Sequence, residues 1–392
     1  MNLNFTMKIF LEKNTVIAAT AAVISLSVGI KVVSELQSDK LKRLTICRLF
    51  SSFPIPSNIM NVLRVYKLHK RLAVCFPDNE EENRAASEWV ESDHRPSDVI
   101  LGTPSKSGTT WIQHILHQLR MRGKEIDFFS SNQIVPWIEI YPHAFGKKAS
   151  EIEQPGEFRV MKTHMIWEQL EESGIVRAKA KIVYVFRDLK DVILSLARFV
   201  PPYAHMDPST ISIEDYVWIA SRIRVERGLK NLVDFWKHRN DENILFLFYD
   251  DMKENHRNAV SQIAAFADLS PPADTDLIDL VVKQSTHAYM SSKEHWRKYA
   301  DFDLVDNCAS LLKLSPEQVL PRGRITGKVR KGGGISSRGS ELPSYINDYF
   351  DRCWERIIEK QLGFKTLDEM RAFRAQELKE RPFSLNSKSP FQ

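Results

Sequence analysis

A short turn of small residues, TPSKSGTTW at residues 103–111, carries the clearest chemical signal in this chain. An apolar run precedes it and apolar residues at helical spacing follow it, so the turn would lead from a strand into a helix N-terminus. Backbone N–H groups there would point toward one anion, helped by the helix dipole and by the mobile ammonium of Lys106. The N–H groups of this cradle belong to Ser107, Gly108, Thr109 and Thr110. The turn therefore predicts a phosphate site; a turn that only connects strand to helix is the alternative.

The order of residues in this turn differs from the Walker A pattern, GxxxxGK[ST], in which the lysine follows a glycine. Here Lys106 precedes the SGTT run. An ordinary ATP or GTP hydrolase is therefore disfavoured. A nucleotide kinase or hydrolase that uses this turn stays open as a rival, and magnesium-dependent ATP turnover would support it.

Two further segments place polar side chains directly after apolar runs. The sequence VMKTHM contains His164, and an imidazole with an ordinary pKa of about 6.5 can accept a proton from a hydroxyl at neutral pH. A hydrogen-bonded structural histidine is the alternative. Arg187 follows the next apolar run, and its planar guanidinium suits phosphate oxygens. Asp188 and Asp191 offer it local ion pairs instead.

Four short apolar runs bounded by turn residues would position these side chains. The segments between them show helical spacing of apolar residues. Strands that alternate with helices form parallel sheets, and ligands bind beyond the carboxyl ends of the strands. We therefore predict a single P-loop-like α/β domain with a central parallel sheet flanked by helices. The predicted strands are residues 99–102, 158–162, 181–186 and 244–249.

Taken together, KSGTTW and KTH resemble two segments of the cytosolic-type sulfotransferases, which use 3′-phosphoadenosine-5′-phosphosulfate (PAPS) as co-substrate. The first is similar to the 5′-phosphosulfate-binding loop of that family. This resemblance implies that Lys106 contacts the bridging oxygen of PAPS and that Trp111 stacks on its adenine. The KTH segment implies that His164 is the catalytic base and that Lys162 is a nearby cation.

A third segment, residues 182–199, resembles the family's 3′-phosphate-binding strand and helix. The spacing from arginine to serine is the same, so the resemblance implies that Arg187 and Ser195 bind the 3′-phosphate. It also implies that Ser195 couples recognition of this phosphate to the placement of Lys106.

The adenine side has one full and one partial match. Tyr249 ends a strand and precedes an acidic pair, as does the family's adenine-contacting tyrosine. The segment QSTHAYM, residues 284–290, fits less well. Ser285 and Thr286 suit its small hydroxyl positions, whereas His287 stands where an aromatic residue is usual.

The last matching segment, GKVRKGGG at residues 327–334, resembles the loop that closes over the 3′-phosphate. Arg330 and Lys331 would supply charge, and Gly332 would allow close approach of the backbone. The family commonly continues with GDWK, but this chain has ISSRGSE, and the family's short dimerisation motif has no clear counterpart. The oligomeric state therefore stays open.

The resemblance implies in-line transfer of a sulfuryl group from PAPS to a hydroxyl, less often an amine, of a small-molecule acceptor. It implies neither a metal nor a covalent enzyme intermediate. Aromatic residues before the KTH segment predict a pocket for a lipophilic alcohol, phenol or sterol-like acceptor, with core packing as the alternative. These residues are Phe128, Phe129, Trp137, Tyr141 and Phe145. A rival class is an inactive scaffold that binds 3′-phosphoadenosine nucleotides, against which the presence of His164 argues.

The composition limits the class of partner and the compartment. The 392 residues include 55 basic and 50 acidic side chains, and a net charge of +5 is too small to indicate binding of duplex nucleic acid. Cys47, Cys75, Cys308 and Cys353 form no CxxC pair, so neither a disulfide framework nor a thiolate zinc site is indicated. A reducing, cytoplasmic location is therefore expected.

The N-terminal segment differs from the rest of the chain because residues 14–30 carry no charged side chain. The segment is shorter than the ~20 apolar residues that a membrane span usually needs, so a marginal anchor and a buried or targeting helix both fit. If it spans, the basic residues on its C-terminal side keep the catalytic domain in the cytosol. We expect an N-terminal extension at residues 1–84, a sulfotransferase domain at 85–375 and a polar tail at 376–392.

Overall fold

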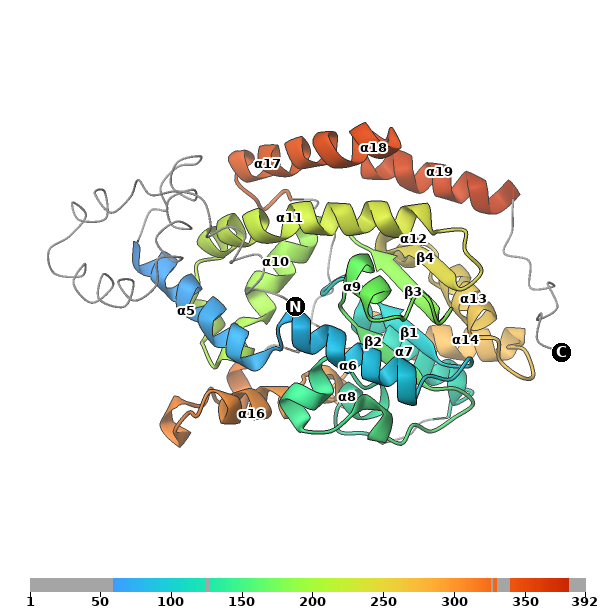
Figure 1. The fold of residues 1–392 in the computed structure, drawn as a ribbon, viewed down its shortest axis with the longest axis horizontal. Helices are drawn as coiled ribbons and strands as arrows, with labels where there is room; N and C mark the ends of the chain where they lie inside the picture. The colour runs from blue at the N-terminus through green and yellow to red at the C-terminus, as the bar shows by residue number, and fades with distance from the viewer. Residues whose placement is uncertain (1–58, 125–126, 326, 330–338, 381–392) are drawn as a thin grey trace, which may run out of the picture.

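The computed structural model describes residues 59–124, 127–325, 327–329 and 339–380 (Figure 1). Three sequence expectations lie outside these ranges: the apolar segment 14–30, the basic loop containing Arg330, Lys331 and Gly332, and residues 381–392 of the tail. Within the described ranges, no helix combines the length and the apolar character needed to cross a bilayer.

The centre of the fold is a four-stranded parallel sheet with the order β2-β1-β3-β4. The strands are β1 (Val99–Gly102), β2 (Val160–Thr163), β3 (Lys181–Phe186) and β4 (Ile244–Phe248). The predicted parallel sheet is therefore confirmed. The second strand begins two residues later than predicted, and the fourth ends one residue earlier because Tyr249 already starts a helix.

Both faces of the sheet are buried, which explains why most strand residues are apolar; the polar ones are Lys162 and Thr163 at the end of β2 and Lys181 at the start of β3. Alternate strand residues enter two separate hydrophobic cores, as the two-residue period of a strand requires. Ile100 and Ile182 belong to one core, and Val99, Leu101 and Val183 belong to the other.

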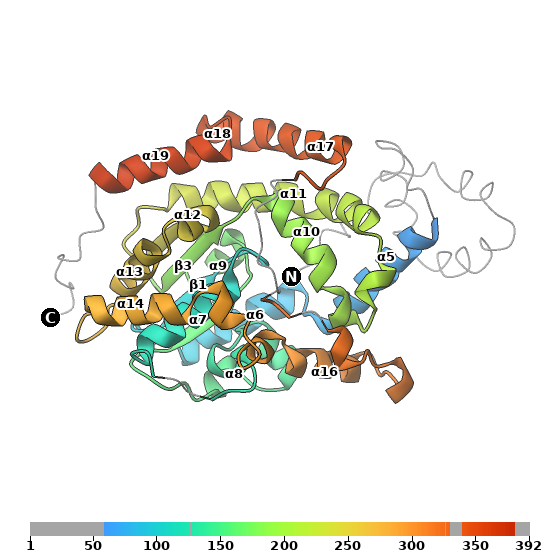
Figure 2. The ribbon, with the colours of Figure 1, turned by 180° about the vertical axis from the view of Figure 1, so that it is seen from behind.

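Helices cover each face of the sheet. On one face, α7 (Thr109–Arg120), α13 (His256–Ala267) and α14 (Thr275–Gln284) contact one another, as Figure 2 shows. On the other face lie α9 (Trp167–Glu172), α10 (Leu189–Phe199) and α11 (Ile213–Lys237), whose buried side chains share a core. This arrangement confirms the predicted flanking of the sheet by helices.

Helices at both ends of the described chain extend the hydrophobic core that contains Ile100 and Ile182. α17 (Ser344–Trp354) packs on α11, and the helices up to α19 (Leu367–Glu380) continue along it (Figure 1). α5 (Ile59–Cys75) and α6 (Asn79–Ser92) precede the sheet, and α5 buries Val65, Leu68, Leu72 and Cys75 in this core. The packed body thus includes helices N-terminal to residue 85, where the sequence placed its start.

Short elements complete the connections between these helices and strands. The α-helical ones are α8 (Ser131–Ile134), α12 (Tyr249–Glu254), α15 (His287–Met290), α16 (Phe302–Leu311) and α18 (Lys360–Leu362). The 3₁₀ and π turns are η1 (Tyr141–Phe145), η2 (Ala149–Glu151), η3 (Pro201–Ala204), η4 (Pro208–Thr210), η5 (Trp296–Tyr299), η6 (Pro316–Gln318), η7 (Arg322–Arg324) and η8 (Glu355–Glu359).

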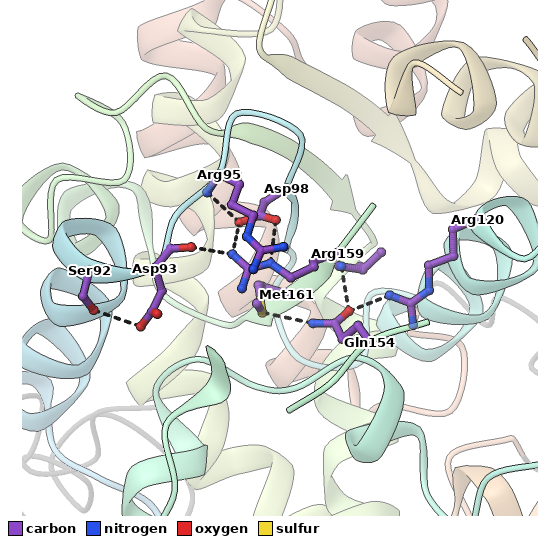
Figure 3. A network of polar contacts seen from close by, with 9 residues as sticks. Ser92, Asp93, Arg95, Asp98, Arg120, Gln154, Arg159 and Met161 are labelled. Atoms are coloured by element: carbon purple, nitrogen blue, oxygen red, sulfur yellow. Dashed lines mark hydrogen bonds and ion pairs between the residues drawn. The ribbon is translucent and has the colours of Figure 1, made fainter. Parts of the chain in front are cut away.

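A buried ion pair fixes the amino ends of β1 and β2 (Figure 3). Arg159 donates to both carboxylate oxygens of Asp98, at 2.9 and 2.6 Å, and the Val99 amide donates to the Arg159 carbonyl at 2.9 Å. Gln154 accepts from the Val160 amide at 2.9 Å and from Arg120 at 2.5 Å. These bonds hold the register of the two strands and therefore align their opposite, carboxyl ends.

Candidate active site

The anion turn leaves β1 and enters α7 through Gly108, which is the N-cap residue of that helix. Gly108 has a φ of 95°, in the left-handed region that disfavours residues with a side chain. A Cβ at this position would lie 2.9 Å from the ring of Tyr249. The hydroxyl oxygens of Thr103 and Thr109 lie 2.6 Å apart and brace the turn. The turn therefore requires glycine for its backbone conformation and for the close approach of Tyr249.

Arg187 follows β3 and lies beside the same turn. Its Nη1 donates to the Lys106 carbonyl at 3.2 Å, and its Cζ lies 4.6 Å from the ring centroid of Tyr249. Its Nη2 lies 3.6 Å from Asp191, whereas Asp188 caps α10 by accepting a backbone hydrogen bond. The local ion pair considered from the sequence thus forms with Asp191, and the guanidinium still contacts the anion turn.

Among the residues that the structure describes, Ser107 Oγ and Arg187 Nε have no hydrogen-bond partner, although both are buried next to this turn. The Ser107 residue is 1% exposed, so water reaches it little. A buried polar group without a partner costs about 1–3 kcal/mol, and an anion at the turn would supply the missing acceptor. These atoms, together with the glycine cradle, fit a phosphate or sulfate group.

Lys106 and Ser195 face the same cavity from different elements. Lys106 Nζ lies 3.5 Å from the ring centroid of Phe199, the last residue of α10. Phe199 is four residues after Ser195, and residues four apart lie on the same face of a helix. The structure therefore brings the lysine of the turn to the helix face that carries Ser195.

His164 lies directly after β2 and is held on both sides of its ring. Its Nδ1 lies 2.5 Å from the Thr103 carbonyl oxygen, which only accepts, so Nδ1 must carry the proton and Nε2 keeps a free lone pair. The backbone amide donates to Glu139 at 2.8 Å, and the ring packs edge-on against Trp137. Burial, and next the charge of Lys162, hold the pKa of His164 well below its usual range. The imidazole is therefore neutral at neutral pH.

Lys162 is the last cation before His164 along β2, and it is 2% exposed. Its Nζ lies 3.7 Å from the ring centroid of Trp137, a cation–π distance. Burial, followed by the like charge of Lys328, lowers the pKa of Lys162 to about 7, although neighbouring carboxylates oppose this change. The charge of Lys162 is therefore sensitive to what binds beside it.

Aromatic and hydroxyl residues gather on the other side of the turn. Trp111 Nε1 donates to the Ser285 carbonyl at 2.8 Å, and the rings of Trp111 and Tyr249 meet edge to face at 6.0 Å. The Ser285 hydroxyl donates to the Val281 carbonyl of α14 at 2.6 Å and lies 3.0 Å from His256 Nε2. Thr286 caps α15, by accepting from the Tyr289 amide, and does not line the cavity.

One cavity of about 300 Å³ connects these side chains. Most of the predicted site residues line it: Lys106, Gly108, Thr109, Thr110, Trp111, Lys162, His164, Arg187, Ser195, Tyr249 and Ser285. His287 lines it as well, whereas Ser107 is buried next to the lining residues Lys106 and Gly108. Side chains that follow four neighbouring strands thus meet at one edge of the sheet, where a parallel sheet binds ligands.

The cavity also has an apolar wall, and most of the residues in this wall were not expected from the sequence. Of the five aromatic residues proposed for the acceptor pocket, Trp137 lines the cavity, but Tyr141 and Phe145 stack on each other and Phe129 is half exposed. Phe128 packs against His117 instead. The apolar wall consists of Leu72, Phe76, Trp137, Leu196, Phe199, Val200, Tyr203 and Met290. The charged residues Asp301 and Lys328 also line the cavity.

The family model of the sulfotransferase domain matches residues 96–302, and the chain belongs to this family. This match covers more than half of the chain, and it confirms the prediction of a PAPS-dependent sulfotransferase over the kinase and hydrolase alternatives. Within the described residues, no group of three or more His, Cys, Asp or Glu side chains is arranged to hold a metal ion.

Similar proteins carry the same family name. The chain is 28% identical over 284 residues to Sulfotransferase 1E1 of Bos taurus, covering 70% of this chain and 88% of that one. It is 28% identical over 200 residues to Amine sulfotransferase of Oryctolagus cuniculus, covering 50% and 64%. Among solved structures, mouse sulfotransferase SULT7A1 complexed with PAP aligns with a TM-score of 0.48 at 18% identity, covering 76% and 95%.

Proposed function

We propose that this chain transfers a sulfuryl group from PAPS to a hydroxyl, or less often an amine, of a small lipophilic acceptor, with His164 as the general base. The observation that carries the proposal is that a neutral His164, with Nε2 unprotonated, lines the same cavity as the anion turn. Binding alone would not require a base at this place.

The residues around the turn fit the donor. The turn amides and Lys106 would hold the 5′-phosphosulfate, and the unpaired Ser107 Oγ and Arg187 Nε offer further polar contacts. Arg187 and Ser195 would bind the 3′-phosphate, and Trp111 and Tyr249 would contact the adenine. Ser285, Thr286, Arg330, Lys331 and Gly332 are proposed to complete the nucleotide site. When bound, the donor supplies an activated sulfuryl group and a phosphate leaving group.

The chain's own residues would orient the acceptor and handle its proton. Nε2 of His164 accepts the hydroxyl proton as the acceptor oxygen bonds to sulfur, and the bridging S–O bond breaks with its electron pair on the phosphate. Lys106 and Lys162 provide positive charge where negative charge develops. A bound anion favours the protonated forms of the nearby Lys106, Lys162 and His164 side chains. The two lysines then keep their positive charge, and His164 becomes a stronger base.

The placement of Lys106 supports a coupling role for Ser195. Lys106 Nζ rests on the ring of Phe199, and Phe199 shares a helix face with Ser195. A phosphate bound at Ser195 would therefore lie close to the helix face on which Lys106 rests. We propose that binding at the 3′-phosphate moves Lys106 from the aromatic ring to the reacting group.

The apolar wall supports a lipophilic alcohol, phenol or sterol-like acceptor. Leu72, Phe76 and Tyr203 line the part of the cavity that the strand ends do not supply. An apolar surface of this kind favours acceptors that leave water on binding. The polar groups near His164 would then select the hydroxyl that is to be sulfated.

The experiment that tests this function uses the full chain. Calorimetry with 3′-phosphoadenosine-5′-phosphate, and with ATP as comparator, tests the nucleotide site. Radiolabelled PAPS offered with phenols, sterols, aliphatic alcohols, amines and polysaccharides then tests transfer. Selective nucleotide binding with label on a lipophilic hydroxyl supports the proposal. Selective binding without transfer to any acceptor would favour the inactive scaffold, and exclusive labelling of polysaccharides would reject the lipophilic acceptor.

A further inference from the structure

A buried ion pair lies on the wall of the cavity, and neither of its residues was given a role from the sequence, although Lys328 stands at the start of the GKVRKGGG segment. Lys328 Nζ lies 2.5 Å from Asp301 Oδ1, and the two side chains are 7% and 1% exposed. Both residues line the cavity together with Lys162 and His164. Removing two charges from water costs free energy that only close pairing offsets. Lys328 and Asp301 therefore hold each other in place.

Asp301 connects three separate parts of the chain. Its Oδ2 accepts from the Tyr203 hydroxyl at 2.6 Å, and its Oδ1 accepts from Asn132 at 3.2 Å as well as pairing with Lys328. The Lys328 amide donates to the Tyr299 carbonyl at 3.0 Å. Because Tyr203 belongs to the apolar wall of the cavity, the ion pair joins residues 327–329 to that wall.

The same pair lies within electrostatic reach of Lys162. Apart from burial, the groups that decide whether Lys162 is protonated are Lys328, Asp301, Glu139 and Asp303, and Lys162 in turn acts on His164. The charge of Lys328 favours neutral Lys162, whereas the three carboxylates favour the ammonium. Loss of either member of the ion pair would therefore change the charge of Lys162.

We propose that Lys328 is a positioning residue for sulfuryl transfer: paired with Asp301, it fixes the cavity wall at Tyr203 and places its positive charge on the same cavity as Lys162. This inference rests on the proposed function of the same site. Lys328 acts through Asp301 and Lys162, and it takes no part in the transfer of the proton or the sulfuryl group.

Replacement of Lys328 and replacement of Asp301 should move the alkaline limb of the pH–rate profile in opposite directions. Lys328→Met removes a positive charge and leaves the Asp301 carboxylate without its ammonium, and both changes favour protonated Lys162. The alkaline limb of the rate profile, where Lys162 loses its proton, moves to higher pH by on the order of one unit. Asp301→Asn leaves the Lys328 charge uncompensated, so the limb moves to lower pH. A purely structural role predicts slower transfer without opposed shifts.

The experiment follows radiolabelled transfer to a simple lipophilic phenol from about pH 6 to about pH 10 in the full chain. It compares the wild type with Lys328→Met, Asp301→Asn, the double variant and Lys328→Arg. The double variant removes both charges, so its limb returns toward that of the wild type, and Lys328→Arg keeps the wild-type profile. Lys190→Met is the matched control, because Lys190 pairs with Asp351 at 2.8 Å outside the cavity.

Asp301 holds several partners, so Asp301→Asn alone could unfold the protein. In that case the double variant is compared with Lys328→Met. With Lys328 already replaced, the Asp301→Asn change removes a carboxylate and leaves no unpaired ammonium at residue 328. Its limb is expected at lower pH than that of Lys328→Met. Limbs that coincide in these two variants, or that move in the same direction in both single variants, would overturn the proposal.

A second readout separates this inference from the proposed function. Lysine labelled with carbon-13 at Cε reports the titration of Lys162 by NMR without any donor, and Lys162→Met identifies the signal. The midpoint is expected to rise in Lys328→Met. A protein that transfers nothing but shows this rise would refute the proposed function and keep the electrostatic coupling. A protein that transfers the sulfuryl group, but in which Lys328→Met leaves the titration midpoint of Lys162 unchanged, would support the proposed function and refute the electrostatic coupling.

Discussion

His164 Nδ1 lies 2.5 Å from the carbonyl oxygen of Thr103, so the turn that follows β1 fixes the imidazole that follows β2. The two strands pair in parallel with Gly102 opposite Thr163, which places the next residues of each strand side by side. The hydrogen bond fixes the tautomer and directs the free lone pair of Nε2 away from Thr103. The imidazole that we propose as the base is therefore oriented by the anion turn itself.

Replacement of the base is the first prediction. His164→Ala should lower kcat by about 10²–10⁴, the usual contribution of a general base, because an alanine side chain cannot take up the hydroxyl proton of the acceptor. Binding of 3′-phosphoadenosine-5′-phosphate should stay close to that of the wild type in calorimetry, since the phosphate contacts come from other strands. Near-normal turnover in folded His164→Ala protein would remove His164 from the mechanism.

The second prediction concerns the glycine of the anion turn. Gly108→Ala should weaken nucleotide binding strongly, because a Cβ there lies 2.9 Å from Tyr249 and φ is 95°. Gly146→Ala is a matched control: its φ is 64°, but a Cβ there has nothing within 4 Å. Calorimetric affinity should therefore fall in the first variant only. Equal affinities in both would show that close packing at the turn is unimportant.

The sequence predicted those parts of the site that depend on local order along the chain. The anion turn, His164, Arg187 and Tyr249 each follow an apolar strand directly, and parallel strands bring their carboxyl ends together. The small errors at the strand ends arise because one residue extends a strand or starts a helix at little cost. The parallel sheet, and the meeting of these segments at one of its edges, could thus be inferred without coordinates, whereas the strand order came from the structure.

The apolar wall of the cavity and the ion pair beside it could not be predicted in the same way, because they are formed by residues far apart in the sequence. Leu72 and Phe76 come from the segment treated as an extension, and Lys328 and Asp301 meet only through tertiary packing. One signal was present: Val65, Leu68, Leu72 and Cys75 repeat at helical spacing and are all buried. That pattern indicates a helix packed on the core rather than a separate extension.

The third prediction tests the ion pair at the amino ends of the strands. Asp98→Asn should lower the free energy of unfolding by about 3–5 kcal/mol, because it leaves the buried Arg159 guanidinium without its carboxylate. Asp279→Asn breaks the exposed pair with Arg257 and should cost less than about 1 kcal/mol. Urea unfolding of both variants measures the difference. Similar losses of stability would show that Arg159 and Asp98 do not anchor the strands.

The fourth prediction follows from the lowered pKa of Lys162, about 7 in the free protein because of burial and of Lys328. A bound anion favours the ammonium, so nucleotide binding should take up a proton above that pH. Affinity for 3′-phosphoadenosine-5′-phosphate should then fall as the pH rises above about 7, by up to about tenfold per unit. Calorimetry in buffers of different ionisation enthalpy measures the uptake.

Lys162→Met is the control for this pH dependence, because the phosphates of the ligand titrate as well. The variant should bind the nucleotide more weakly near neutral pH, where the wild-type lysine is largely charged in the complex. Above that pH, nucleotide binding to the variant should take up fewer protons than binding to the wild type. The affinities of the two proteins should converge as the solution becomes alkaline. Identical proton uptake in both would mean that Lys162 keeps one charge state when the nucleotide binds, and the predicted coupling would be wrong.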